Sequence, residues 1–200
     1  MEDASTKARI ESTTDEVFAL YRKHGDVDYI GEPVTQSEHA VQCAMLANKD
    51  GYPEEVILGA LFHDIGHVLG IDRGMQRMIT GDVQLGTADH DIVGEDYLKN
   101  LGFPSSVTDI VRGHVSAKRY LVATDKKYND NLTVASKMTL VHQGGPMTRE
   151  EADEFEKNPN FEAILKMRHW DESAKDPYVK MNQILDYVEL CKRVLKNNLK

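Results

Sequence analysis

Apolar residues recur every three or four positions along most of this chain, which is the spacing that places them on one face of a helix. No stretch alternates between apolar and polar residues for long enough to predict a strand. The pattern predicts helices over residues 15–23, 35–49, 87–101, 133–143 and 178–197, and others from 53 to beyond 64, from 104 to beyond 114 and from 148 to 171. The sequence therefore predicts an all-α fold.

Local signals mark several of these helix ends. Thr35 with Glu38, and Thr148 with Glu151, have the spacing of a capping box, in which each side chain bonds the other residue's backbone N–H. Thr87 is a further expected N-cap. Residues 71–86 are rich in glycine and charged residues and have no period, so we expect a mobile loop that can cover a neighbouring site.

The length of the chain and its net charge restrict the number of domains and the kinds of partner that we expect. The 200 residues contain no Pro/Gly/Ser-rich linker, and we expect a single domain over residues 1–200. The net charge is -9 and the basic residues are scattered, which argues against a nucleic-acid partner. A small anionic ligand is still compatible with this charge, because a few converging lysines and arginines can bind one inside an acidic protein.

The cysteines and the hydropathy pattern suggest a compartment. Cys43 and Cys191 are far apart in predicted helices, and we expect them to be free thiols in a reducing environment. Residues 1–11 are polar and lack the apolar core of a signal peptide, and no apolar run approaches the length of a membrane span. We therefore expect a cytoplasmic protein with no membrane partner.

The stretch Leu61-Phe62-His63-Asp64-Ile65-Gly66-His67 places polar side chains at the end of an apolar helix. On a continuous helix, His63 and Asp64 point about 100° apart, and His67 lies one turn further along the face of His63. A lone buried histidine usually satisfies its hydrogen bonds within the core. Three such residues within one short apolar stretch instead favour a metal site.

Further candidate ligands are spread over the other predicted helices. In chain order, the candidate set is His39, His63, Asp64, His90, His114 and Asp171. Imidazole and carboxylate groups together suit divalent iron, manganese or zinc. This many side chains leave little room around one catalytic metal, so we expect two metals that share Asp64 as a bridging ligand.

Several longer motifs occur in the same order as these ligands. They are DYIGE at 28–32, QSEH at 36–39, LFHDIGH at 61–67, GHVSAKRYL at 113–121, QGGPM at 143–147 and RHWDE at 168–172. The His-Asp pair resembles that of the HD-domain superfamily, whose members are mostly metal-dependent phosphohydrolases. The full set is similar to the mixed-valent diiron oxygenases of that superfamily, in particular the dioxygenases that cleave 1-hydroxy-2-aminoethylphosphonates.

The resemblance implies an HD-domain helical bundle around a dinuclear centre with two iron ions per chain, mixed-valent, and O₂ as cosubstrate. It implies that one iron is held by four of the candidate ligands, His39, His63, Asp64 and Asp171. It assigns the second iron to Asp64, His90 and His114. The implied partner is a small organophosphonate, whose carbon-phosphorus bond is cleaved to give phosphate and glycine, or glycine betaine if the nitrogen is trimethylated.

The resemblance also assigns residues to the substrate. Tyr29 matches a tyrosine that occupies an iron position until substrate displaces it, and Glu32 matches a carboxylate that meets the substrate ammonium group. The groups that match the phosphonate cradle are His67, Lys118, Ser136 and Arg168. Judged singly, a lysine on a helix is usually solvated, an arginine usually pairs with a neighbour on the helix surface, and a serine usually only packs.

Two other functions are compatible with the same residues. A phosphohydrolase could use metal-activated water on a phosphate ester, although the Tyr29/Glu32 loop and the additional His90 and His114 argue for the oxygenase. A metal-stabilised binding module without turnover is the third alternative, and the number of polar groups suited to a small ligand argues against it. The sequence leaves the methylation state of the substrate nitrogen open.

Overall fold

The computed structural model describes residues 4–198 and is mostly helical, as the sequence predicts. Its helices are α1 (Ala4–His24), α2 (Gln36–Lys49), α3 (Glu54–Phe62), α4 (Ile65–Arg73), α5 (His90–Asn100), α6 (Ser105–Thr124), α7 (Lys126–Asn131), α8 (Val134–His142), α9 (Arg149–Phe155), α10 (Phe161–Ser173), the 3-10 helix Ile184–Tyr187 and α11 (Val188–Asn198). One antiparallel hairpin, β1 (Arg77–Thr80) and β2 (Val83–Thr87), stands between α4 and α5 in the chain.

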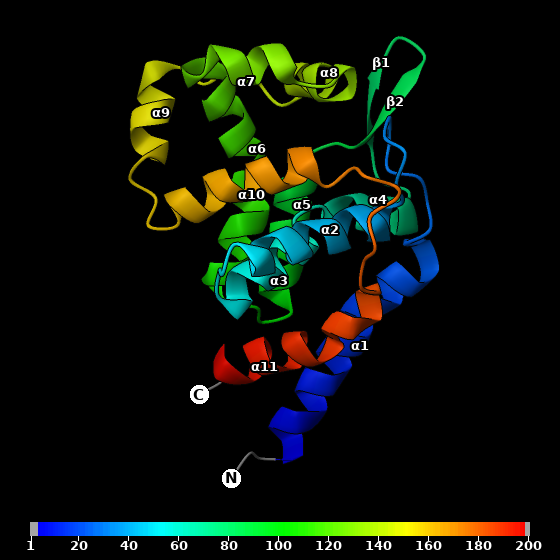
Figure 1. Cartoon of the computed structure of the whole chain (residues 1–200). Coiled ribbons are helices and arrows are strands. Elements are labelled where there is room, and N and C mark those ends of the chain that lie inside the picture. Colours follow the sequence, from blue (N-terminus) through cyan, green and yellow to red (C-terminus); the bar gives the residue numbers. More distant parts are fainter. Residues whose placement is uncertain (1–3, 199–200) are drawn as a thin grey trace.

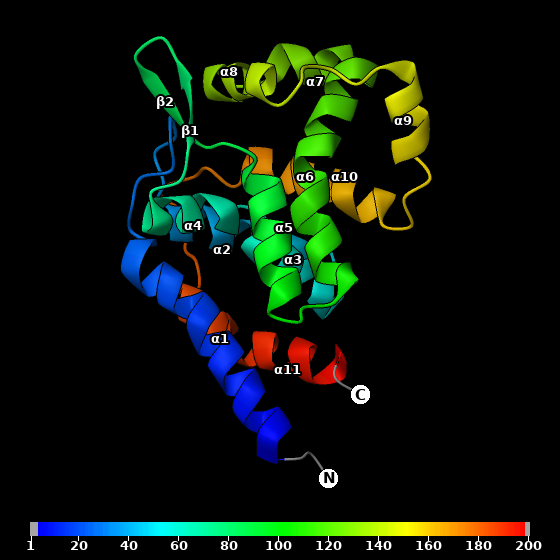
Figure 2. The same cartoon turned by 180° about the vertical axis from the view of Figure 1, so that it is seen from behind.

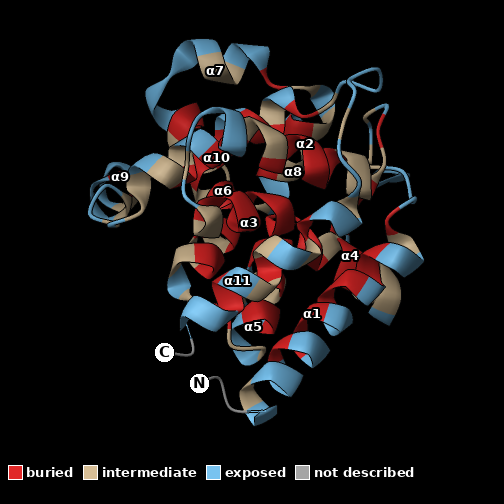
Figure 3. Cartoon of the chain, turned by 60° about the horizontal axis from the view of Figure 1, so that its bottom comes forward, coloured by how far each residue is buried: buried red, intermediate tan, exposed pale blue. Residues whose placement is uncertain are grey.

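Helix α3 lies at the centre of the bundle and packs against α2, α6 and α11 (Figure 1). Every residue from Val56 to Phe62 is buried, which is the expected state of a helix that is apolar on all sides. Buried positions concentrate on α3 and on the faces of the helices around it (Figure 3). Helices α5 and α6 run side by side on the opposite face (Figure 2). Helices α1 and α11 pack against each other at the bottom of the view in Figure 1.

The expected helix starts at 35 and 148 are confirmed. The Thr35 hydroxyl accepts from the Glu38 backbone N–H at 3.2 Å, and the Glu38 carboxylate accepts from the Thr35 N–H at 2.7 Å. Thr148 and Glu151 form the same reciprocal pair at the start of α9. The first capping box fixes the start of α2 and therefore the position of His39 in the first turn of this helix.

The prediction of one continuous helix from residue 53 to beyond residue 64 was wrong. The chain leaves α3 after Phe62, and α4 begins at Ile65 with Asp64 in its N-cap position, outside helical geometry (φ -102°, ψ 15°). His63 and His67 therefore do not occupy successive turns of one helix. Asp64 is buried at this break between the two helices.

The expected loop over residues 71–86 and the absence of strands were also wrong. Helix α4 continues to Arg73, and the hairpin β1–β2 occupies most of the remaining segment. Met78 is the buried residue of β1, and Leu85, Gly86 and Thr87 are buried consecutively in β2, so neither strand shows the alternation that reveals a strand in a sequence. In both views the hairpin stands beside α8 (Figures 1 and 2), so its position depends on tertiary contacts.

Other helix boundaries differ from the prediction for identifiable reasons. Helix α5 starts at His90 after Asp89 in the left-handed region (φ 51°), and Thr87 ends β2 instead of capping the helix. The expected helix over 148–171 is divided into α9 and α10 by residues 156–160. Helix α1 starts earlier than predicted, at Ala4, and its buried face includes Ile10, Thr13 and Thr14. The last helix starts later, and helix α7 was not predicted.

Two simpler expectations agree with the structure. Cys43 and Cys191 are both buried and unpaired. Within residues 4–198, no helix combines the length and the apolar composition needed to cross a membrane.

Candidate metal centre

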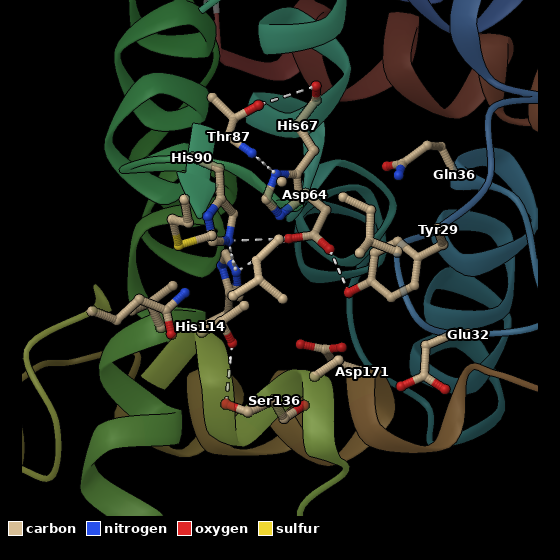
Figure 4. Close-up of a pocket in the computed structure, with 18 of the residues that line it drawn as sticks. Tyr29, Glu32, Gln36, Asp64, His67, Thr87, His90, His114, Ser136 and Asp171 are labelled. Carbon is tan, nitrogen blue, oxygen red and sulfur yellow. Dashed lines mark hydrogen bonds and ion pairs between the residues drawn. The ribbon is translucent and has the colours of Figure 1, made fainter. Parts of the chain in front are cut away.

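All six predicted metal ligands are buried and come together in the middle of the bundle. They come from five places in the fold: His39 from α2, His63 and Asp64 from the α3–α4 junction, His90 from the start of α5, His114 from α6 and Asp171 from α10. Figure 4 shows Asp64 at the centre, with His90 and His114 on one side of it and Tyr29 on the other. The helix packing therefore assembles what the sequence separates by up to 132 residues, the distance from His39 to Asp171.

The first cluster is built on His39 and His63, whose Nε2 atoms face each other at 3.1 Å. Each ring donates through Nδ1 to a backbone carbonyl, His39 to Ala174 at 2.9 Å and His63 to Ala60 at 2.8 Å. Since a carbonyl only accepts, both Nδ1 atoms carry the proton, and in the neutral rings both Nε2 atoms present lone pairs. Two lone pairs at this distance repel each other unless a cation lies between or beside them.

The electrostatics of His63 also favour a positive charge at this point. Burial lowers the pKa of His63, but the Asp64 and Asp171 carboxylates together outweigh burial and raise the pKa to about 9. The Asp171 carboxylate lies 3.4 Å from His39 Nε2, and its other oxygen accepts a hydrogen bond from Arg168. A metal ion would meet the same electrostatic demand as a proton, with ligands already oriented by their second hydrogen bonds.

The second cluster has the same construction. The Nε2 atoms of His90 and His114 face each other at 3.0 Å, and His114 Nδ1 donates to the Val111 carbonyl at 2.6 Å. Among the described residues, His90 Nδ1 is buried without a hydrogen-bond partner. The facing Nε2 lone pairs of His90 and His114 would again be stabilised by a cation between or beside them.

Asp64 connects the two clusters because each of its oxygens faces one of them. Oδ1 lies 3.4 Å from His90 Nε2 and 3.3 Å from His114 Nε2, whereas Oδ2 lies 3.7 Å from His39 Nε2 and 3.4 Å from His63 Nε2. Burial raises the pKa of Asp64, but the neighbouring imidazoles reverse this effect and hold the pKa well below its usual range. Asp64 is therefore an ionised carboxylate in bridging position, and the two clusters are consistent with a dinuclear metal site.

Cys43 is a neighbour of the first cluster that the sequence analysis missed. It follows His39 by one helical turn on α2, and its Sγ lies 3.9 Å from His39 Nε2. Burial raises the pKa of this thiol well above its usual range, so it stays protonated and is a poor ligand compared with a thiolate. The spacing of four residues from His39 was the signal that could have identified it.

A cavity of about 160 Å³ opens beside the two clusters. Asp64, His90, His114 and Asp171 line one side of it. Tyr29 donates from its hydroxyl to Asp64 Oδ2 at 2.9 Å, and its ring stacks on His39 with the centroids 4.0 Å apart. The loop that carries Tyr29 therefore lies directly against the candidate metal site.

The residues predicted to hold a phosphonate line the same cavity. These are His67, Lys118, Ser136 and Arg168. Lys118 is only 3% exposed, so it is not the solvated residue that a lysine judged singly would be. Arg168 does pair with helix neighbours, Asp171 and Glu172, but it is only 4% exposed and so is not a surface residue. Lys118 donates to Thr139 Oγ1 at 2.9 Å, while Arg168 Nε donates to the Tyr128 hydroxyl at 2.7 Å.

His67 faces the cavity with a defined proton position. Its Nδ1 accepts from the Thr87 backbone N–H at 3.0 Å, so the proton of the neutral ring is on Nε2. Its ring stacks on His90 with the centroids 3.9 Å apart. Burial lowers the pKa of His67 to about 4, which keeps this ring neutral at physiological pH.

Glu32 lines the cavity on the side away from His90 and His114 (Figure 4). It pairs with Lys175, a residue that the sequence analysis did not single out. Lys175 follows Glu172 by three residues, which was a weak sequence signal for an acidic partner nearby.

Two glycines allow helix α4 to approach the end of β2 and the start of α5. A Cβ atom on Gly66 would lie 1.9 Å from the His90 carbonyl oxygen, and one on Gly70 would lie 1.9 Å from Thr87 Oγ1. The first of these contacts involves backbone and cannot be relieved by a side-chain rotation. Gly66 therefore sets how closely His90 approaches Asp64.

Replacing Gly66 with alanine should push α4 and α5 apart and displace His90. We expect a loss of about 1–3 kcal/mol in the free energy of unfolding, together with weaker binding of metal, measured by denaturant unfolding and metal titration. The control is Thr148→Ala, which removes a remote cap at a cost of about 1 kcal/mol and should leave metal binding unchanged. Unaltered metal affinity in Gly66→Ala would show that this contact does not position His90.

A bundle with paired His/Asp clusters at a helix junction defines an HD-domain protein, and the chain belongs to that family. The HD domain family profile matches residues 37–191. This agrees with the resemblance inferred from the motifs.

Three relatives extend the comparison. The chain is 41% identical over 92% of its length to [1-hydroxy-2-(trimethylamino)ethyl]phosphonate dioxygenase (glycine-betaine-forming) of Leisingera caerulea, covering 90% of that protein. It is 38% identical over 88% of its length to hydroxymethylphosphonate dioxygenase of Gimesia maris, covering 86% of that protein. It is 41% identical over 80% of its length to an uncharacterized protein of Acanthamoeba polyphaga mimivirus, covering 71% of that protein. The chain therefore belongs to the group of HD-domain proteins that includes phosphonate dioxygenases.

Proposed function

We propose that this chain is an iron- and O₂-dependent oxygenase that cleaves the carbon-phosphorus bond of a small 1-hydroxyphosphonate. The observation that carries the proposal is Asp64, whose two oxygens face two separate imidazole pairs beside a cavity with buried cations. The substrates expected from the sequence are 1-hydroxy-2-aminoethylphosphonate, which gives phosphate and glycine, and its N-trimethyl analogue, which gives phosphate and glycine betaine. The similarity to two phosphonate dioxygenases supports this class of reaction.

The proposed ligands divide into two sets that share Asp64. The first iron is assigned to His39, His63, Asp64 and Asp171, and the second to Asp64, His90 and His114. Imidazole and carboxylate donors suit iron in its divalent and trivalent states, in keeping with a mixed-valent pair. When bound, the irons supply Lewis acidity towards the substrate oxygens and the electrons exchanged with O₂.

The phosphonate end of the substrate is assigned to the buried cationic side of the cavity. Lys118 and Arg168 neutralise the dianion, and Arg168 is oriented by its hydrogen bonds to Tyr128 and Asp171. His67 donates from Nε2, and Ser136 offers its hydroxyl. Lys118, Arg168 and Ser136 are buried, and a charge-assisted hydrogen bond is stronger in a buried site than at the surface.

Two residues are assigned to the other end of the substrate and to the entrance of the site. Burial raises the pKa of Tyr29 well above its usual range, so its hydroxyl stays protonated and donates to Asp64 until a substrate takes its place. Glu32 is the carboxylate assigned to a substrate ammonium group. Together, these residues orient the substrate along the cavity, with the reacting carbon next to the metal ligands.

The reaction balances without a further co-reactant. One C–H bond and the C–P bond of the substrate break, the carbon becomes a carboxylate, and the phosphorus leaves as phosphate. O₂ accepts the four electrons, and its oxygen atoms end in the two products. The protein's own residues neutralise the phosphonate, fix the orientation of the carbon and exclude water.

The proposal is tested with purified, iron-loaded protein. We expect two irons per chain by metal analysis, and oxygen uptake matched one to one by phosphate release with the unmethylated or trimethylated substrate. Phosphoethanolamine, a phosphate ester of similar size, serves as the control and should give neither oxygen uptake nor phosphate. Rapid hydrolysis of that ester without oxygen uptake would instead support an HD-type phosphohydrolase.

A further inference from the structure

Helix α8 and its C-cap residue present a row of polar side chains to the cavity. Ser136, Thr139 and Gln143 all line the cavity, and their spacing of three and four residues places them on one face of the helix. The Thr139 hydroxyl accepts from Lys118 Nζ at 2.9 Å. Gln143 follows Thr139 by about one turn, which places it on the cationic side of the cavity, where the phosphonate is assigned.

The residues after Gln143 hold this end of α8 against α6. Gln143 is the C-cap residue of α8, and Gly144 and Gly145 follow it with positive φ (94° and 72°), a conformation that glycine adopts without strain. The Gly145 carbonyl accepts from Arg119 Nε at 2.9 Å, and Arg119 directly follows Lys118 on α6. The QGGPM motif therefore fixes the backbone of Gln143 beside α6, without any hydrogen bond from the Gln143 side chain.

The amide oxygen of Gln143 has no partner in this position. Gln143 Oε1 is buried and lacks a hydrogen-bond partner within residues 4–198. The other two side chains of the row are bonded within the protein. Thr139 donates to the Ser136 carbonyl at 3.1 Å, and Ser136 Oγ accepts from the Thr133 hydroxyl at 3.2 Å. Because a buried polar group without a partner is unfavourable, a ligand that pairs with Gln143 gains binding energy.

A phosphonate is a suitable partner for this amide. Rotation by 180° about the last side-chain bond exchanges the amide oxygen and nitrogen of Gln143, so the same position can present an N–H group. A phosphonate dianion offers only acceptors, on three oxygens. Arg168 already donates through all three of its nitrogens to acceptors in the protein, so only its remaining N–H groups can reach a ligand. A neutral donor such as Gln143 adds a hydrogen bond to the dianion without adding positive charge to the buried wall.

We propose that Gln143 is a further phosphonate-binding residue, whose side-chain amide donates to a phosphonate oxygen from the end of α8. The inference rests on the proposed function, since it concerns the end of the substrate at which the carbon-phosphorus bond is cleaved. Gln143 contacts the phosphonate in the substrate and in the transition state alike. Its loss therefore raises KM and leaves kcat nearly unchanged.

The test measures the binding of a phosphonate and turnover in the same iron-loaded proteins. Methylphosphonate, which carries the phosphonate but no 1-hydroxyl group, is the probe for binding by isothermal titration calorimetry. In Gln143→Met, which has a similar length and no amide, we expect its Kd to rise about tenfold, as for the loss of one hydrogen bond to a charged group. KM for 1-hydroxy-2-aminoethylphosphonate should rise by about the same factor, with kcat within about twofold of the wild type.

Further variants separate this contact from an effect on packing. Gln143→Glu has nearly the same shape but places a negative charge beside the phosphonate, so the Kd for methylphosphonate should rise by at least about a hundredfold. Gln76→Met removes an exposed amide just before β1 and should leave both Kd and KM unchanged. Thermal unfolding and metal analysis should show that these variants keep the fold and the iron content of the wild type. Gln143→Leu replaces Gln143→Met if the methionine variant does not fold.

The assignment of Gln143 fails if the Kd for methylphosphonate in the folded Gln143→Met protein stays within about twofold of the wild type, or if the wild type does not bind methylphosphonate. It also fails if kcat falls while KM is unchanged, which would indicate a structural role. Absence of oxygen uptake by the iron-loaded wild type contradicts the oxygenase instead. In that case the Kd comparison still decides whether Gln143 binds a phosphonate.

Discussion

Asp64→Ala is expected to release both metal ions and to abolish oxygen consumption. The Asp64 carboxylate is the group that faces both imidazole pairs, at 3.3–3.7 Å from the four Nε2 atoms. Without it, each pair loses an anionic ligand, and the positive charge of each metal loses its nearest compensation. We expect much less iron per chain than in the wild type by metal analysis, since the loss of a ligand shared by both sites should weaken each of them by at least about tenfold.

A matched control removes a carboxylate that has no place in the site. Asp82 lies in the exposed turn between β1 and β2, and Asp82→Ala should keep both irons and full oxygen uptake. Circular dichroism should show that Asp64→Ala retains its helices, which separates loss of metal from loss of fold. Full iron content in a folded Asp64→Ala protein would show that Asp64 does not bridge two metals.

Lys118→Met is the second variant with a large expected effect. If Lys118 neutralises the phosphonate as proposed, removing this buried cation should cost about 3 kcal/mol of binding to substrate and transition state, or roughly a hundredfold in kcat/KM. Methionine has a similar shape and is apolar, so the fold should tolerate it at a buried position. Lys137→Met, on the exposed side of α8, is the control and should leave kcat/KM unchanged. Wild-type kinetics in Lys118→Met would show that Lys118 does not bind the phosphonate.

The same lysine predicts a pH dependence. Burial and the nearby Arg168 lower the pKa of Lys118 from 10.5 to about 7, so its positive charge is present below about pH 7 and is lost above it. We therefore expect KM for the phosphonate to rise as the pH increases through 7 in the wild type, and Lys118→Met to lack this rise. In the unfolded chain the lysine keeps its proton up to about pH 10.5, so this group makes the fold more stable as the pH rises from 7 towards 10.5. A steady-state pH profile and urea unfolding at several pH values measure the two effects.

The sequence contained enough local information to identify most helices and the types of ligand. Capping boxes at Thr35 and Thr148 were readable because they depend on residues three positions apart. The clustering of His63 and Asp64 in an apolar stretch was readable for the same reason. Motif order then connected these residues to the HD-domain proteins, which the family match confirms.

The errors lie where distant contacts override a local pattern. The helix predicted through Asp64 breaks at that residue, since the break brings its carboxylate between the two histidine pairs. The strands of the hairpin at 77–87 are too short to be recognised from their sequence. The hairpin is held in place by its contacts with α4 and α8, which are distant-contact information that no local pattern contains. Lys118 and Arg168 would be exposed on most helices and are buried here by the elements packed around them.

The sequence by itself determined a helical chain with free cysteines, a net negative charge and a set of imidazole and carboxylate groups suited to metal. Only the tertiary structure decided that the histidines meet as two pairs, that each oxygen of Asp64 faces one pair, and that Lys175 pairs with Glu32. The physical reason is that helical periodicity and capping act over a few residues. The meeting of side chains from α2, α5, α6 and α10 depends on how those helices pack around α3, which no short stretch of sequence encodes.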